Sequence, residues 1–307
     1  MAQSSAPTAR VLRVLEALRL HAHEGLRYAE LAQAADVSQA TCHAILATLT
    51  DAGYVVRDPS SKTYSLGPAL LGLGDAAARS FPEIRLARAE LDALATETGL
   101  RCHVAKVVDD AITVVAVAGA AAAEDPIRPG TRVPFVPPFG AIHVAWSSVH
   151  DIEQWIRHAP SRVFAAARLR EVVEDHRRTR CAVAPYTPAS ARLRELLGEL
   201  ASDGVPDHVR ARTVELLSAI DRLDYTSDDL HTDEPLSVNT ITAAVFDHHA
   251  KVAFAVGLHV AEPALAASAV ERLSHALVGA ADRMTDAIGG RIPNMSHSVL
   301  EPEPVGS

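Results

Sequence analysis

Residues 26–67 read LRYAELAQAADVSQATCHAILATLTDAGYVVRDPSSKTYSLG and decide the fold of the first part of the chain. Two short amphipathic segments are separated by a tight polar break, Asp36-Val37-Ser38. Ser38 is placed to accept a hydrogen bond from the free N–H groups that open the next helix. The apolar residues of that helix are spaced i, i+3, i+4 and i+7, at Cys42, Ile45, Leu46 and Leu49. This spacing forms one apolar stripe that must face a small core, which leaves the opposite side free.

A small hairpin is predicted directly after this helix. Gly53 ends the helix, and residues 54–57 and 62–66 have the composition of strands joined by the turn Asp58-Pro59-Ser60-Ser61. Arg57 and Lys62 belong to this hairpin. A wing that carries two cations is expected to lie along phosphates, although a hairpin with solvated charges is the alternative interpretation.

Two further helices are predicted before the polar break. Residues 26–35 form the second helix, and Thr8 caps the first, whose apolar residues repeat the same spacing at Val11, Val14, Leu15 and Leu18. Three helices and a hairpin make a winged helix-turn-helix over residues 1–67, a module that docks in the major groove of DNA.

Length and charge limit what this module does alone. A chain of 307 residues is long enough for about two domains. The net charge of −9 gives no overall attraction to nucleic acid. The module itself is neutral, because its cations Arg10, Arg13, Arg19, Arg27, Arg57 and Lys62 are matched by Glu16, Glu24, Glu30, Asp36, Asp51 and Asp58. Weak contacts of each subunit with phosphates must be multiplied, so we expect a homodimer or a dimer of dimers.

The second part of the chain is predicted to be an α+β domain. Residues 68–98 form a helical linker that is broken at Phe81-Pro82. Strands at 101–107 and 112–118 are followed by a loop over 119–138. The other predicted elements are a helix beginning near Gly140, helices at 150–158, 163–180, 189–202 and 205–222, strands at 237–246 and 252–260, and a helix at 263–288. Strands at both ends of a helical middle indicate a sensor domain over residues 99–290, with a disordered tail at 291–307.

No motif indicates catalysis, a metal or another cofactor. The three cysteines lack ligand spacing and are expected to be reduced and structural. His21-Ala22-His23 and His248-His249 lack a third ligand at a recognisable spacing, and no nucleophile elbow, P-loop or dinucleotide fingerprint occurs. The sequence contains neither a signal peptide nor an apolar membrane span, so we expect a cytoplasmic protein that is neither an enzyme nor bound to a membrane.

The order of elements and several motifs resemble the IclR family of bacterial transcription regulators over roughly residues 8–288. The matching segments are RYAELA at 27–32, TCHAILATL at 41–49, DAGYV at 51–55, YSLG at 64–67, RPGTRVP at 128–134, FGA at 139–141 and AAVFD at 243–247. The resemblance implies a winged helix-turn-helix followed by a GAF-like domain that binds a small effector.

The chain departs from the family pattern in three places. The family often has lysine where this chain has Ala141, and it favours arginine where this chain has Ala44. Residues 188–224 have the character of a helical insertion. These differences remove a cationic contact near the effector and a contact with DNA, and the insertion makes the ligands of relatives a poor guide.

The predicted DNA contacts lie on the third helix and the wing. With the apolar stripe inward, Ala40, Ala44 and Ala47 point outward with Gln39 and His43 beside them. Gln39 could read adenine and His43 a guanine acceptor, and for both a solvated role is equally favoured. Arg27 either contacts a phosphate or leaves its helix poorly capped. The full predicted set is Arg27, Ser38, Gln39, Ala40, Thr41, His43, Ala44, Thr48, Arg57, Lys62 and Tyr64. Paired modules predict an operator with inverted half-sites.

The predicted effector site combines the residues with the resemblance. A helix opening at Phe139-Gly140-Ala141 presents N–H groups to an acidic ligand, and the apolar strands favour an organic acid with a hydrophobic body. The resemblance implies pocket positions at Thr240, Gly257 and His259, and a further position near Asp228 or Asp229. His103 and His259 lie in apolar strands, where a hydrogen-bonded core histidine is the alternative. The predicted ligand set is therefore His103, Phe139, Gly140, Ala141, Asp229, Thr240, Gly257 and His259.

These features predict a regulator in which the effector shifts a two-state equilibrium and the linker transmits the change to the paired DNA-binding modules. A helix-turn-helix used only for contact with another protein, combined with the same sensor domain, is the alternative interpretation.

Overall fold

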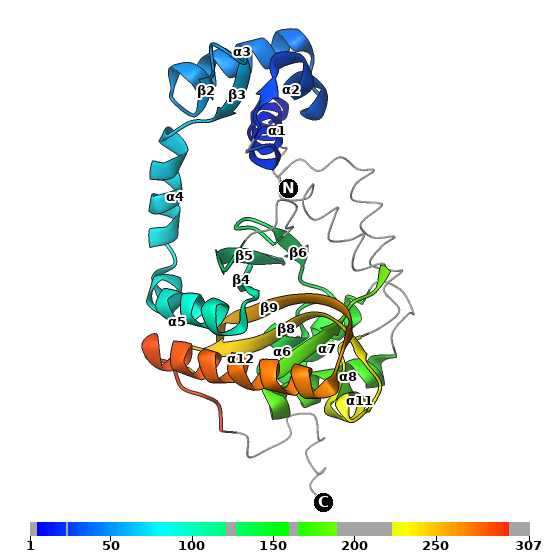
Figure 1. Cartoon of the computed structure of the whole chain (residues 1–307). Coiled ribbons are helices and arrows are strands. Elements are labelled where there is room, and N and C mark those ends of the chain that lie inside the picture. Colours follow the sequence, from blue (N-terminus) through cyan, green and yellow to red (C-terminus); the bar gives the residue numbers. More distant parts are fainter. Residues whose placement is uncertain (1–4, 23, 121–126, 160–164, 189–222, 295–307) are drawn as a thin grey trace, which may run out of the picture. The chain divides into compact units, whose positions relative to one another are not determined.

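The computed structural model describes residues 5–22, 24–120, 127–159, 165–188 and 223–294. The chain divides into two compact units, and the boundary in the described residues lies between Pro82 and Glu83. Figure 1 shows the elements of both units. Across the described ranges, no helix combines the length and the apolar character that crossing a bilayer requires.

The first unit is a small helical module with a three-stranded sheet. Its elements are α1 (Ala6–Leu20), β1 (Leu26–Arg27), α2 (Tyr28–Ala34), α3 (Gln39–Asp51), β2 (Val55–Arg57), β3 (Thr63–Leu66) and α4 (Ala69–Arg79). The strands are antiparallel in the order β1-β3-β2. This is the predicted winged helix-turn-helix, with β2 and β3 as the wing.

Two predictions for this unit are wrong in detail. The first helix begins at Ala6 rather than after Thr8, because Ser5 takes the extended N-cap position. The Thr8 hydroxyl donates to Ser5 Oγ at 3.0 Å from inside the first turn. Residues 26 and 27 are a short strand paired with β3 rather than the start of a helix. A two-residue strand leaves too short a pattern for sequence periodicity to detect.

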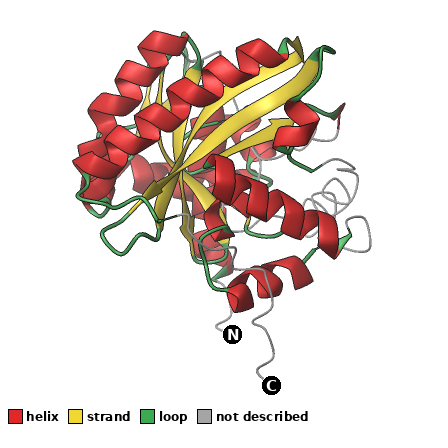
Figure 2. Cartoon of the chain, turned by 90° about the horizontal axis from the view of Figure 1, so that it is seen from below, coloured by secondary structure: helices red, strands yellow, loops and turns green. Residues whose placement is uncertain are grey.

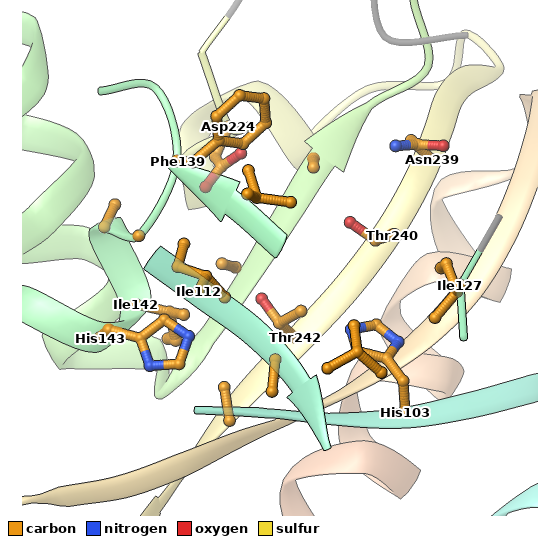
Figure 3. Close-up of a pocket in the computed structure, with 18 of the residues that line it drawn as sticks. His103, Ile112, Ile127, Phe139, Ile142, His143, Asp224, Asn239, Thr240 and Thr242 are labelled. Atoms are coloured by element: carbon orange, nitrogen blue, oxygen red, sulfur yellow. The ribbon is translucent and has the colours of Figure 1, made fainter. Parts of the chain in front are cut away.

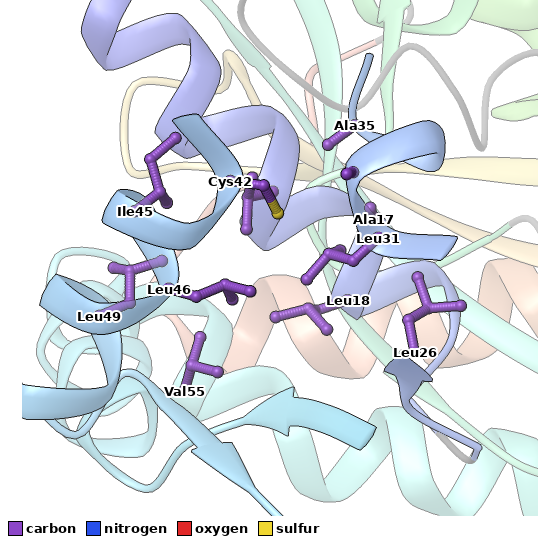
Figure 4. Packing of buried hydrophobic residues seen from close by; sticks show 12 residues of the cluster. Ala17, Leu18, Leu26, Leu31, Ala35, Cys42, Ile45, Leu46, Leu49 and Val55 are labelled. Atoms are coloured by element: carbon purple, nitrogen blue, oxygen red, sulfur yellow. The ribbon is translucent and has the colours of Figure 1, made fainter. Parts of the chain in front are cut away.

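The apolar stripe of α3 forms the core of this unit. Figure 4 shows Cys42, Leu46 and Leu49 directed toward Leu18 and Val55. The core residues that are less than a tenth exposed are Val14, Ala17, Leu18, Leu26, Leu31, Ala32, Ala35, Cys42, Ile45, Leu46, Leu49 and Val55. Helices α1, α2 and α3 and strands β1 and β2 contribute, so the module has its own closed core, as the spacing predicted.

The second unit is built on a six-stranded antiparallel sheet. In chain order its elements are α5 (Pro82–Thr98), β4 (Arg101–Val108), β5 (Ala111–Ala118), β6 (Arg132–Pro134), α6 (Ala141–Val144), α7 (Val149–Arg157), α8 (Ala166–Thr179), β7 (Cys181–Pro185), α11 (Ser227–Leu230), β8 (Leu236–Phe246), β9 (Val252–Leu265) and α12 (Ala267–Ala287). The strand order is β6-β5-β4-β9-β8-β7.

Helices cover both faces of this sheet (Figure 2). Helix α12 packs along β8 and β9, and α6 contacts β7, β8 and β9. Ala244 and Phe246 of β8 belong to a buried cluster with Ile142 of α6. The ring of Phe246 meets the edge of Trp146, with centroids 4.9 Å apart. Strands enclosed on both sides and separate helical segments give the predicted α+β fold.

The structure corrects several predicted elements of this unit. Strand β6 lies inside the predicted loop at 119–138, and β7 and α11 were not predicted. Strand β9 continues to Leu265, so the last helix begins at Ala267 instead of 263. The last part of β9 pairs with β8, where Glu262 lies opposite Val238. The predicted helices at 189–202 and 205–222 and the tail beyond 294 lie outside the described residues.

Candidate DNA-binding surface and effector cavity

The start of α3 is held as the sequence predicted. Ser38 is extended, and its Oγ accepts a hydrogen bond from the Thr41 backbone N–H at 3.2 Å. The side chains that face away from the core are exposed and mostly small, namely Gln39, Ala40, His43, Ala44, Ala47 and Thr48, while Thr41 is half-buried. The Thr48 hydroxyl donates to the Ala44 carbonyl at 3.1 Å, so the helix itself uses its proton. Among the described residues of the first unit, none covers this face of α3.

Tyr28 orients α3, a role that the sequence analysis did not assign. Its hydroxyl donates to the backbone carbonyl of Gln39, and its ring meets the edge of the His43 ring with centroids 6.2 Å apart. Tyr28 therefore contacts the residues on either side of the first turn of α3. The sequence signal was an aromatic residue between exposed Arg27 and Ala29, which would otherwise be an unusual choice at the first position of a short helix.

The wing and the start of α2 share a shallow hollow. It is lined by Arg27, Tyr28, Ala29, Arg57, Ser60, Ser61, Lys62 and Tyr64. The Arg57 guanidinium carbon lies 5.8 Å from the centre of the Tyr64 ring, within the range of a cation–π contact. The exposed side chains of Arg27 and Lys62 border the same hollow. Four residues of the predicted DNA-contact set, Arg27, Arg57, Lys62 and Tyr64, thus lie together on one face.

The capping question at Arg27 has a structural answer. The Glu30 carboxylate accepts a hydrogen bond from the Arg27 backbone N–H at 2.8 Å. An acidic residue in the first turn also suits the positive end of the helix dipole. Helix α2 is therefore capped through Glu30, and the Arg27 guanidinium is exposed.

A carboxylate shapes the tip of the wing. Asp58 Oδ1 accepts hydrogen bonds from the Ser60 backbone N–H at 2.7 Å and from Ser60 Oγ at 2.6 Å. These hydrogen bonds, with that from Ser61, lower the pKa of Asp58 to about 2. The turn thus keeps a negative charge between the cations Arg57 and Lys62.

A cavity of about 210 Å³ lies in the second unit, on one face of its sheet (Figure 3). Alternate residues of a strand point to the same face. Most of the strand residues that line the cavity follow this rule in pairs: His103 and Ala105, Ile112 and Val114, Ala182 and Ala184, Thr240 and Thr242, Ala255 and His259. The segment from Pro138 to His143 and residues Ile127, Thr131, Val133, Asp224 and Asn239 complete the lining.

Six of the eight predicted ligand residues line this cavity. They are His103, Phe139, Gly140, Ala141, Thr240 and His259. Gly257 lies on the same face but beneath the His103 ring, where an added Cβ would be 2.4 Å from His103 Cε1. Its role is to leave space for the imidazole, because Gly257 is the residue of β9 directly opposite His103 of β4.

Asp229 does not line the cavity, so the structure gives no support to its predicted role. Its Oδ2 accepts hydrogen bonds from the Thr226 N–H at 2.8 Å and from the Arg168 guanidinium at 2.6 Å. Asp229 therefore caps α11. The carboxylate that does line the cavity belongs to Asp224, the last residue of the predicted insertion at 188–224.

The helix predicted to begin at Phe139-Gly140-Ala141 is a single turn, and its contact with an acidic group stays a prediction. Helix α6 spans only Ala141–Val144, and Gly140 before it is left-handed with φ of 91°. One turn has little macrodipole to offer an anion. The Gly140 carbonyl accepts from His143 N at 2.9 Å and from Val144 N at 3.1 Å, so the turn is held by its own backbone.

Two histidines in the cavity are held neutral. Burial is the main cause that lowers the pKa of His103 to about 4, with His259, His143 and Arg101 adding repulsion. Burial alone lowers the pKa of His143 to about 4. His103 is 8% exposed, and its Nδ1 has no hydrogen-bond partner among the described residues. The sequence analysis missed His143, although it stands two residues after Ala141.

The cavity carboxylate is perturbed in the opposite direction. Burial raises the pKa of Asp224 to about 7. Its Oδ2 lies 3.4 Å from Nε2 of His176, which is fully buried and whose pKa burial lowers to about 4. A neutral imidazole supplies no counter-charge, so Asp224 gains little from this neighbour.

Other predicted features of the sequence are accounted for elsewhere. Cys42, Cys102 and Cys181 are free and buried. His21 Nδ1 lies 2.9 Å from the Ala17 carbonyl, and the rings of His248 and His249 are 3.8 Å apart. Within the described ranges, no three His, Cys, Asp or Glu residues are placed to hold a metal ion.

Comparison with known proteins identifies the class of the first unit. Residues 7–59 match the family model of the IclR helix-turn-helix domain. Over 81 residues the chain is 37% identical to a probable HTH-type transcriptional regulator, ArcR, of Halobacterium salinarum. That match covers 26% of this chain and only 30% of the relative's length.

Solved structures share the fold of the whole chain. The IclR transcriptional regulator of Alicyclobacillus acidocaldarius is 21% identical, with 94% of this chain and 100% of that chain covered and a TM-score of 0.55. An IclR homologue of Microbacterium hydrocarbonoxydans, complexed with 4-hydroxybenzoate, is 14% identical, with 92% and 99% covered and a TM-score of 0.57. The IclR of Thermotoga maritima is 16% identical, with 90% and 97% covered and a TM-score of 0.53.

Residues 7–59 of the first unit thus match the IclR type of helix-turn-helix domain. The chain also shares the α+β fold of solved IclR regulators, as the sequence resemblance implied.

Proposed function

We propose that this protein regulates transcription by binding double-stranded DNA through α3 and the wing, under the control of a small organic molecule in the cavity of the second unit. The observation that carries the proposal is the exposed, small-residue face of α3 above a closed core. Such a face suits close approach to base edges in the major groove. This activity would be regulatory rather than catalytic, and it agrees with a cytoplasmic location.

The contacts divide into two kinds. Gln39 and His43 are proposed to contact bases. The hollow bordered by Arg27, Arg57, Lys62 and Tyr64 suits phosphates, which position a module without reading its sequence. Because the module carries equal numbers of cations and carboxylates, useful affinity requires two modules on one operator. We therefore propose a homo-oligomer and an operator with inverted half-sites.

The cavity supports the sensing part of the proposal. It is mainly apolar, with a few polar groups that converge from different strands, which is the usual character of a small-molecule site. The homologue from Microbacterium hydrocarbonoxydans has a small aromatic molecule, 4-hydroxybenzoate, in its complex. We propose an effector with an apolar body here too. The predicted acidic group has no cationic partner among the described lining residues.

A gel-shift experiment with the DNA that flanks the gene of this protein tests the DNA-binding proposal. We expect a shift with the native flank and a weaker one with a scrambled flank of equal length. Gln39→Ala should reduce the difference between the two DNAs, whereas the exposed control Gln154→Ala on α7 should leave it unchanged. Absence of any shift, with both units folded, would favour the alternative that the helix-turn-helix contacts only another protein.

A further inference from the structure

The charges around the cavity are one-sided. Among the described residues that line it, Asp224 is the only Asp or Glu, and there is no Lys or Arg. His103 and His143 are neutral, as shown above. Arg101, near His103 at the start of β4, is engaged elsewhere, because its guanidinium donates to the carbonyls of Ile127 at 3.2 Å and Gly119 at 3.3 Å. Asp224 is therefore the only acidic group of this described lining, and His259 is its remaining titratable side chain.

The other groups that face Asp224 do not neutralise it. From α8 comes His176, which is fully buried and neutral. From β7 comes Cys181, whose pKa burial raises to about 12, so that its thiol is uncharged. A carboxylate taken out of water without a counter-charge is costly and binds a proton more readily. The raised pKa of Asp224 in the free protein results from this loss of hydration.

This environment selects the charge of a ligand. An anionic effector would place a second negative charge in a low-dielectric space that already holds Asp224, so binding would require protonation of one carboxylate. A cationic ligand has the opposite effect, because it supplies the missing counter-charge and keeps Asp224 ionised.

We propose that the effector carries a protonated amine that pairs with Asp224, and an apolar body that packs on Ile112, Val114 and Phe139. The inference rests on the proposed effector-binding function and names the chemical class of the ligand. This amine takes the place of the organic-acid effector that the sequence predicted.

The lining offers further acceptors for such a group. An ammonium has three N–H donors and needs acceptors for each. Asn239 and Thr240 line the same cavity as Asp224, and Figure 3 shows the Thr240 hydroxyl directed into it. His103 and His143 lie across the cavity from Asp224 in this view. The unpartnered Nδ1 of His103 is available to a second polar group at the other end of the ligand.

The size of the cavity limits the ligand. A volume of about 210 Å³ is below the range of about 300–1,000 Å³ that drug-sized ligands occupy. A single ring with a short aminoalkyl chain is of suitable size. The probes that distinguish the charge are therefore 2-phenylethylamine, 2-phenylethanol and phenylacetate, which share a body and differ in the charged or neutral end.

The experiment measures the melting temperature of the full chain with each probe, followed by calorimetric titration at about pH 8 and about pH 6. We expect the amine to bind most tightly, the alcohol less and the acid least. Affinity for the amine should fall about tenfold between these pH values, because Asp224, with its pKa of about 7, is protonated in the free protein at the lower pH. Acid binding should strengthen over the same change.

A near-isosteric variant tests the proposed partner. Asp224→Asn should weaken amine binding about thirtyfold and remove its pH dependence. The matched control Asp228→Asn, at an exposed carboxylate on α11, should change neither. If Asp224→Asn does not fold, the pH dependence of the native chain still decides.

The outcomes separate the two proposals. Binding of the alcohol or the acid without binding of the amine would overturn the proposal of an amine effector, but the cavity would still be an effector site. An amine that binds equally well at both pH values, or to Asp224→Asn, would also overturn the inference. If none of the three probes binds, the proposal of an amine effector is overturned. The DNA-binding proposal is decided separately by the gel shift.

Discussion

The two surfaces proposed for binding differ in how the chain builds them. The DNA-binding surface consists of one helix and one hairpin that are close in sequence, and its side chains are exposed. The cavity gathers residues from all six strands and from connecting segments between His103 and His259, and its side chains are buried or half-buried. Charges on the first surface are screened by salt, whereas those in the cavity shift pKa values. Binding of DNA should therefore depend on ionic strength, and binding of the effector on pH.

The largest expected effect comes from the core under the DNA-binding surface. Leu46→Ala removes a side chain that is 2% exposed and should lower the free energy of unfolding by about 3 kcal/mol. Leu71→Ala is the control, because Leu71 of α4 is 77% exposed and should cost less than about 0.5 kcal/mol. Urea unfolding measures both. Equal losses would mean that the module lacks the independent core described above.

A smaller effect is expected at the cavity. Gly257→Ala would place Cβ 2.4 Å from His103 Cε1 and 2.9 Å from Thr242 Cγ2, so one of them must move. We expect a loss of about 2 kcal/mol from overpacking, together with altered probe binding. Gly279→Ala is the matched control, since the added Cβ meets only Arg283 at 3.6 Å in the interior of α12. That change should be neutral or stabilising by up to about 1 kcal/mol. Unaltered probe affinity in Gly257→Ala would show that His103 does not contact the ligand.

The exposed surface should divide into residues that read sequence and residues that position the protein. Gln39→Ala should cost about 1.5 kcal/mol at the preferred operator and little elsewhere. Lys62→Ala should weaken binding to all sequences and reduce the slope of log affinity against log salt by about 1. Footprinting and salt titration measure the two effects. The reverse pattern would exchange these assignments.

The smallest effect is expected from Tyr28→Phe. This change removes the hydroxyl that donates to the Gln39 carbonyl and keeps the ring beside His43. A lost hydrogen bond of this kind costs about 1 kcal/mol, here as reduced operator affinity with little change in the salt slope. Tyr54→Phe in the same core provides a control for the loss of a hydroxyl. If both variants bind the operator as tightly as the native chain does, Tyr28 does not position α3.

The same difference between the regions explains what the sequence could predict. The spacing from Cys42 to Leu49 and the cap at Ser38 are local signals, and the structure confirms both. In the cavity, the alternation of strand residues that places Thr240 in the lining also places Thr242 there, so Thr242 was predictable. Asp224 had no such signal, because its contact with the cavity joins distant parts of the chain. The resemblance favoured Asp229 instead, but that residue caps α11.

The path of the polypeptide has a consequence for signalling. Helix α5 ends at Thr98, and after two residues the chain enters β4, which lies between β5 and β9 and carries His103. The segment that follows the DNA-binding unit thus continues almost immediately into a strand of the cavity wall. A molecule that displaces His103 would move a strand that begins directly after α5. Such a displacement would reach the end of α5 without passing through the other strands of the sheet.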